Sequence, residues 1–146
     1  MKLLAMIVFA MLAVIAAVHI YWGLGGLWPA TDEQTLVKTV IGAPGWTQMP
    51  PPWMTFIVSG LIFSAGLFAL RLGGVVTAAP LWFARLAGAV LTIVFAGRGA
   101  SGYWIKANGP AQTEPFATLD ALYFSPLCIA FGLAFAILTI AAPRNG

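Results

Sequence analysis

Four long apolar segments constrain the fold of this chain more than any other feature. They cover about residues 3–22, 53–70, 81–102 and 119–142, and an α-helix needs roughly 20 apolar residues to cross a membrane. A membrane interior supplies no water to backbone polar groups, so a chain crosses it as helices or as a closed barrel. The segments predict an all-α membrane protein whose four transmembrane helices form an antiparallel bundle, in a single domain over residues 1–146.

Composition supports this class and excludes others. Of the 146 residues, 61% are hydrophobic and 8% are charged, whereas soluble domains carry about 25% charged residues. The seven Lys and Arg residues are scattered singly, without the basic stripe that follows phosphates, so nucleic acid is excluded as a partner. The lone Cys128 allows neither an internal disulfide nor a cysteine-based metal site. We expect the lipid bilayer as the main partner, with no metal and no cofactor.

Charged residues fall into two sets at opposite ends of the segments. One set is purely basic and consists of Lys2, Arg71, Arg85 and Arg144. The other holds four acidic and two basic residues, namely Asp32, Glu33, Lys38, Lys106, Glu114 and Asp120. Positive charge collects on the cytoplasmic side of membrane proteins. Both termini are therefore predicted in the cytoplasm and the two longer loops outside, in the inner membrane of a bacterium.

The first segment also has features of a secretory signal peptide. Lys2 precedes it, and small residues lie near a possible cleavage point at Ala13, Ala16 and Ala17. The apolar stretch is long for a signal peptide, and aromatic rather than polar residues follow it. These two features favour a retained first span.

The first outer loop contains a pattern typical of a short amphipathic helix. Thr31 and Gln34 have the spacing of a capping box, in which the two side chains bind free amides at a helix start. The apolar residues that follow share one helical face; they are Leu36, Val37, Val40 and Ile41. Gly42 is suited to ending the helix. We expect this helix to lie on the outer surface of the membrane.

Small residues recur every four positions along the third segment. They are Ala84, Gly88, Thr92, Ala96 and Ala100. Small side chains let membrane helices approach closely, so this ladder is predicted to pack against another span.

Several polar and aromatic residues are predicted to meet near the outer ends of three segments. Arg98 lies thirteen residues after Arg85, or about 20 Å further along a helix. Because a charge at membrane depth is costly unless paired, Arg98 and Asp120 are predicted partners. The candidate ligand-binding pocket consists of His19, Trp22, Arg98, Asp120 and Tyr123. Ser125 and Pro126 are predicted to loosen the last span beside it and free backbone carbonyls.

Four of the five pocket residues also have a purely structural explanation. His19 can be a helix-end imidazole, Trp22 can belong to an interfacial aromatic belt, and Arg98 can extend to lipid phosphates. Asp120 can serve the helix dipole. A haem or pigment bound by His19 stays open. No nucleophile adjoins the histidine, so no catalytic residue is assigned and the question of an enzymatic activity stays open.

With these residues in view, the chain resembles a bacterial family of small four-span integral membrane proteins of unknown function. The resemblance rests first on His19-x-Tyr21-Trp22-x-x-Gly25-Gly26-x-Trp28-Pro29 and on Asp120-x-x-Tyr123-x-Ser125-Pro126-Leu127-Cys128. It also includes Val40-Ile41-Gly42 and Arg98. The family implies the four-span topology and supplies no activity.

Three functions are compatible with these features. The first is a multi-pass membrane protein whose outward pocket binds a small anionic or amphipathic ligand. The second is an accessory or structural subunit of a larger membrane complex, with the aromatic residues and the small-residue ladder as contact surfaces. A transporter or channel formed by an oligomer is the weakest, because only Ser64 and Thr92 are polar near the midplane and an ion path needs such residues.

Overall fold

The structure, a computed structural model, describes residues 1–143. Within this range all regular secondary structure is helical, and four helical stretches are long and apolar enough to cross a membrane. The first three are α1 (Lys2–Gly23), α3 (Pro52–Leu72) and α4 (Leu81–Asn108). The fourth consists of α5 (Phe116–Leu119), the π-helix η1 (Asp120–Phe124) and α6 (Ser125–Ala141). The predicted fold class is confirmed.

The third span is longer than predicted. It was expected to end at residue 102, but α4 continues to Asn108, which makes it about 42 Å long at the rise of an α-helix. Tyr103 to Ala107 contain no helix breaker, whereas Gly109 and Pro110 disfavour a further turn. The aromatic residues Tyr103 and Trp104 therefore lie inside the helix rather than in a loop.

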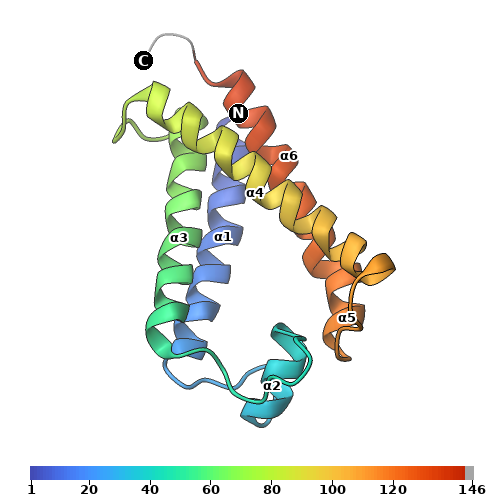
Figure 1. The fold of residues 1–146 in the computed structure, drawn as a ribbon. Coiled ribbons are helices and arrows are strands. Elements are labelled where there is room, and N and C mark those ends of the chain that lie inside the picture. The colour runs from blue at the N-terminus through green and yellow to red at the C-terminus, as the bar shows by residue number, and fades with distance from the viewer. Residues whose placement is uncertain (144–146) are drawn as a thin grey trace.

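The long helices form two antiparallel pairs. In Figure 1, α1 runs beside α3, and α4 runs beside α6. The pairs meet at the end where α1 begins and α6 ends, which we call the terminal end, and diverge toward the opposite end. The core combines small alanine side chains with larger aliphatic and phenylalanine side chains: Ala5, Val8, Leu12, Ala65, Ala69, Leu72, Ala84, Phe131, Ala134, Phe135, Leu138 and Ala142. Because close packing is concentrated toward the terminal end, the other end has room between the pairs.

The small-residue ladder packs as predicted over only part of its length. Ala84 and Gly88 are buried, and a side chain at Gly132 of α6 would press on Ala96. A four-residue step drifts about 40° around a helix, so the ladder leaves the contact face and Ala100 is exposed. The packed face of α4 continues instead through Gly99 and Gly102.

The predicted loop helix is present as α2 (Glu33–Val40), which lies near the diverging ends of the helix pairs (Figure 1). Its N-cap is Asp32, so the prediction that Thr31 caps this helix is wrong. The Thr35 backbone N–H donates to Asp32 Oδ1 at 2.9 Å, and an ionised carboxylate accepts such a bond more strongly than a hydroxyl. Its apolar residues Leu36 and Val37 are buried.

The loop after α2 joins this region to the segment before α5. Gly42 has φ +66°, and a side chain there would collide with the ring of Phe116. The Thr113 backbone N–H donates to the Gly42 carbonyl at 3.1 Å. The loop after α2 is therefore held against the segment that leads from α4 into α5. We call the end of the molecule where α2 and α5 lie the α2 end.

The two sets of charges remain separated along the helices. Lys2, Arg71 and Arg85 lie at the beginning or end of helices at the terminal end. Arg144, the fourth member of the basic set, lies outside the described residues. The cytoplasmic location of the terminal end stays a prediction.

Candidate functional site

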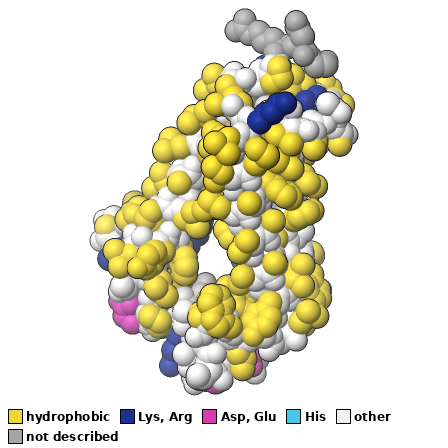
Figure 2. Space-filling model, turned by 180° about the vertical axis from the view of Figure 1, so that it is seen from behind, with side chains coloured by type: hydrophobic (Ala, Val, Ile, Leu, Met, Phe, Trp, Pro, Cys, Tyr) yellow, Lys and Arg dark blue, Asp and Glu magenta, His cyan; other side chains and the backbone are white. Residues whose placement is uncertain are grey.

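A cavity of about 530 Å³ lies between the two helix pairs toward the α2 end. Figure 2 shows an opening between the two halves of the molecule, bordered largely by hydrophobic side chains. Representative apolar lining residues are Leu12, Ile15, Val58, Ile62, Phe95 and Phe131. His19 of α1 and Arg98 of α4 also line it. The cavity is therefore a mainly apolar space with polar groups contributed by both helix pairs.

Arg98 and Asp120 form the predicted ion pair. The Arg98 Nη2 and Asp120 Oδ1 atoms are 2.6 Å apart, with Asp120 2% exposed and Arg98 42% exposed. The second carboxylate oxygen accepts a hydrogen bond of 2.9 Å from the Ser125 hydroxyl. Both oxygens of the buried carboxylate are occupied, whereas the partly exposed guanidinium has five N–H groups and uses one in this bond.

The π-helix aligns these groups. The Ser125 backbone N–H bonds to the Asp120 carbonyl, five residues earlier, which is the spacing that defines a π turn. The Ala121 carbonyl would next need the N–H of Pro126, which proline does not have. The Tyr103 hydroxyl donates to this free carbonyl at 3.0 Å. The predicted loosening at Ser125 and Pro126 is confirmed, and its unpaired carbonyl is satisfied from α4.

Two glycines of α4 allow the close approach that the ion pair needs. A side chain at Gly102 would collide with Ser125 Oγ and Asp120 Oδ2, and one at Gly99 would lie 2.7 Å from the Ser125 carbonyl oxygen. Nothing lies within 4 Å of a side chain built at Gly97. Sequence reasoning did not single out Gly102, although it follows Arg98 by four residues and therefore shares its helical face.

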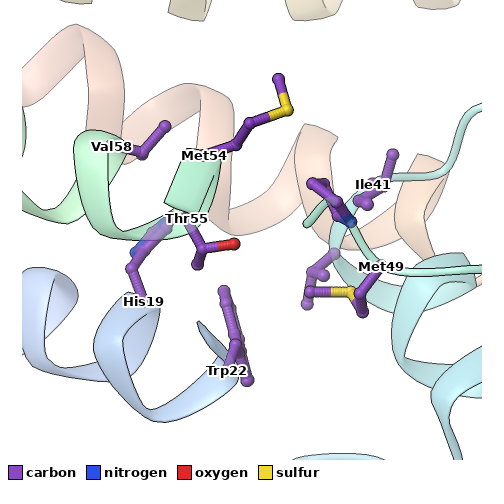
Figure 3. Close-up of a pocket in the computed structure, with 9 residues that line it drawn as sticks. His19, Trp22, Ile41, Met49, Met54, Thr55 and Val58 are labelled. Carbon is purple, nitrogen blue, oxygen red and sulfur yellow. The ribbon is translucent and has the colours of Figure 1, made fainter. Parts of the chain in front are cut away.

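His19 lies where the main cavity adjoins a smaller one of about 210 Å³. Its Nδ1 atom is 2.8 Å from the Ile15 carbonyl oxygen, and because a carbonyl only accepts, Nδ1 carries the hydrogen of this bond. The ring of Trp22 meets the imidazole edge to face, with centroids 5.2 Å apart. Figure 3 shows both rings beside Thr55 of α3. Because Nδ1 carries the hydrogen of the bond to Ile15, Nε2 is an acceptor whenever the imidazole is neutral.

The remaining predicted residues divide between the cavity and its surroundings. Trp22 lines the cavity, and its indole N–H donates to the Trp28 carbonyl at 2.7 Å, so it presents an apolar ring. Asp120 is buried beside Arg98. Tyr123 is 62% exposed, and it is Phe124 that lines the cavity. The wider turn of the π-helix rotates Tyr123, three residues after Asp120, further from the face of Asp120 than an α-helix would.

Metal binding has no support in the part of the chain that the structure describes. Residues 1–143 contain no group of three or more His, Cys, Asp or Glu side chains arranged to hold a metal ion. Cys128 lines the same cavity as His19, but two such ligands are fewer than a structural zinc site uses. The chemistry that the cavity offers is hydrogen bonding and charge on an apolar surface.

Comparison with known proteins gives a family and no activity. No curated protein and no solved structure matches the chain. A family described as "Protein of unknown function (DUF3995)" matches residues 12–135, a range that holds every residue of the cavity. The chain, a helical protein with four spans long enough to cross a membrane, therefore belongs to this family of unknown function.

Proposed function

We propose that this protein binds a small amphipathic molecule in the cavity between its helix pairs, with the polar head of the ligand at Arg98. The observation that carries the proposal is the state of Arg98. Its charge is paired with a buried carboxylate, yet the side chain is 42% exposed and lines a mainly apolar cavity. A ligand with an acceptor oxygen and an apolar body complements both features.

An amphipathic ligand fits better than a small hydrophilic anion. Aliphatic and aromatic side chains from both helix pairs dominate the lining, and they offer no partner for a second polar group away from Arg98 and His19. Burying a polar group without a partner costs several kcal/mol, roughly 2–7 depending on the reference state. A compact polar anion would incur this cost, whereas an apolar chain would gain by leaving water.

The bilayer itself is the proposed source of the ligand. The opening between the halves (Figure 2) lies along helices that are long and apolar enough to cross a membrane, so lipid would surround it. With the terminal end in the cytoplasm, the cavity would face the outer side of a bacterial inner membrane. An amphiphile already in that leaflet would enter sideways between the pairs.

Titration with a fluorescent single-chain amphiphile tests the proposal. We would follow dansyl-undecanoic acid binding to the protein in phosphatidylcholine nanodiscs and subtract the signal from empty nanodiscs. Val58 lines the cavity, so Val58→Trp should abolish saturable binding without touching the ion pair. Leu61 is exposed on the same helix outside this lining, and Leu61→Trp is the matched control. Equal binding by both variants would reject the proposal.

A role as an accessory subunit of a membrane complex is the second candidate. It is favoured by an apolar groove on α1 and α3 that includes the small residues Ala13, Ala17 and Gly60, since small residues permit close helix contacts in membranes. Extraction in a mild detergent followed by mass measurement tests this candidate. Recovery of a monomer or homodimer alone would count against it.

A further inference from the structure

We propose that an anionic amphiphile binds in this cavity together with one proton, and that His19 holds the proton. The inference rests on the proposed function and names its ligand class and its regulation. The ligand is a single-chain amphiphile with one negative charge, such as a carboxylate or a sulfonate.

The charges around the empty cavity balance. Arg98 is the one Lys, Arg, Asp or Glu side chain among the described residues that line it. Its positive charge is already offset by Asp120, which is 2% exposed and also bonded to Ser125. The cavity is therefore neutral before a ligand enters, although Arg98 still has N–H groups to donate.

Adding an anion to this neutral cavity is costly. A negative ligand at Arg98 would share this guanidinium with Asp120 and leave one excess negative charge in an apolar space. Such a charge is expensive at membrane depth unless a second positive group balances it. An anion therefore binds well only if the protein gains a positive charge at the same time.

A titratable side chain in the cavity lining can supply this positive charge. His19 and Cys128 are the titratable residues besides Arg98 that line the cavity. A thiol can add only negative charge, which leaves His19, the only histidine in the chain. Its Nδ1–H already donates to the Ile15 carbonyl, so a proton can join Nε2 without breaking that bond, and both nitrogens of an imidazolium donate.

The groups packed around His19 set the direction of the coupling. Its neighbours in the smaller cavity are uncharged, including Trp22 of α1, Thr55 of α3 and Val40 of α2. Arg98 shares the larger cavity with it, and the positive charge of Arg98 is offset by Asp120. A bound anion would add a negative charge that this pair does not balance, and a nearby negative charge favours a cation. By linkage, the anion then favours protonation of His19 as strongly as the proton favours the anion.

The experiment uses two ten-carbon probes and the full chain in phosphatidylcholine nanodiscs. Decanesulfonate stays anionic at all working pH values and cannot carry the proton itself, and decanol is its uncharged match. For wild type, decanesulfonate affinity should fall as pH rises from 5 to 8, by up to about tenfold per pH unit. Where the affinity falls that steeply, calorimetry in two buffers of different ionisation enthalpy should give close to one proton taken up per bound sulfonate. Decanol should bind with no proton uptake.

Variants and one spectroscopic measurement locate the proton. His19→Gln should remove both the pH slope and the proton uptake for decanesulfonate, while Cys128→Ser should keep both. Because the chain has a single histidine, ¹⁵N-histidine labelling reports its protonation in wild type without any variant. Adding decanesulfonate at pH 7.5 should convert its nitrogen signals from the neutral to the imidazolium pattern.

The outcomes separate this inference from the proposed function. Saturable decanesulfonate binding without proton uptake, or uptake with an unchanged histidine spectrum, would overturn the inference and leave the proposed function standing. Saturable binding of decanol with no binding of decanesulfonate at pH 5–8 would do the same. If neither probe binds saturably, the proposed function fails as well.

Discussion

Replacing Arg98 by methionine should destabilise the protein more than removing its partner Asp120. Methionine keeps a long apolar side chain but leaves the Asp120 carboxylate, 2% exposed, with the Ser125 hydroxyl as its remaining hydrogen-bond donor. Removing one partner of a buried ion pair typically costs about 3–5 kcal/mol. We therefore expect Arg98→Met to lower the free energy of unfolding by about 3 kcal/mol or more.

Asp120→Ala leaves a different group unpaired. The Arg98 side chain is 42% exposed, and a long guanidinium side chain can move its charge toward water or headgroups. The expected loss is about 2 kcal/mol, close to that of a lost hydrogen bond to a charged group. The double variant should show a coupling energy of about 1–3 kcal/mol, because removing the second partner adds little once the first is gone.

Reversible unfolding in mixed micelles, followed by tryptophan fluorescence during SDS titration, measures these differences. Arg85→Met is the matched control, because Arg85 Nη2 donates to the Ala142 carbonyl at 2.9 Å and forms no ion pair with a described carboxylate. The control should cost less than Arg98→Met. A loss of unfolding free energy below about 1 kcal/mol for Arg98→Met, or equal losses for Arg98→Met and Asp120→Ala, would refute the conclusion that the buried carboxylate tolerates loss of its partner less well than the exposed guanidinium.

Two further predictions concern glycines near close helix contacts, and a third concerns the N-cap of α2. Gly102→Ala should lower the free energy of unfolding by about 1–3 kcal/mol through overpacking, whereas Gly97→Ala, with open space around it, should be neutral or stabilising in the same SDS titration. Gly42→Val should separate α2 from α5, because Gly42 has a positive φ and lies against the ring of Phe116. Thiol-reactive reagents should then label Cys128 in the cavity faster, and an unchanged labelling rate would contradict this prediction. The Thr35 backbone N–H holds the pKa of the Asp32 carboxyl below its ordinary 3.8, so this cap stabilises α2 above pH 3.8 and is lost as pH falls through the lower folded value. Amide exchange at Thr35, corrected for intrinsic rates, should show that loss in wild type and not in Asp32→Asn.

The sequence was sufficient to predict the features that follow from the length of the apolar segments and from the cost of an unpaired charge in a membrane. Four apolar segments predict four helices because a membrane requires internal backbone hydrogen bonds. The pairing of Arg98 with Asp120 followed because neither charge is stable alone at that depth, and the structure forms the pair at 2.6 Å. These predictions needed no knowledge of how the helices cross.

Features that depend on helix crossing or on a single turn could not be predicted. A regular α-helix through Asp120 would place both Tyr123 and Phe124 near the face of Asp120; the π turn rotates Tyr123 outward, and Phe124 alone of the two lines the cavity. Likewise Gly102 became significant only once Ser125 lay against it. The divergence of the helix pairs depends on where the packed core residues gather, and helical spacing alone does not specify that.

The capping of α2 shows a different limit. Thr31 and Asp32 are adjacent, and both residue types are good N-caps, so the choice between them depends on where the chain leaves the loop. The structure begins α2 at Glu33 and caps it with Asp32. The predicted amphipathic face survives this one-residue shift, because the burial of Leu36 and Val37 depends on the spacing of apolar residues and not on the cap.

Photo-crosslinking in nanodiscs most directly tests the central claim that the cavity binds an amphiphile with its head at Arg98. The probe is a single-chain carboxylate with a diazirine in its chain, and mass spectrometry maps the modified residues. The account predicts saturable labelling of cavity residues such as Phe95, Leu127 and Phe131, which Val58→Trp removes and Leu61→Trp preserves. Labelling that does not saturate and that concentrates on exposed residues such as Ile93 and Leu133 would contradict the account.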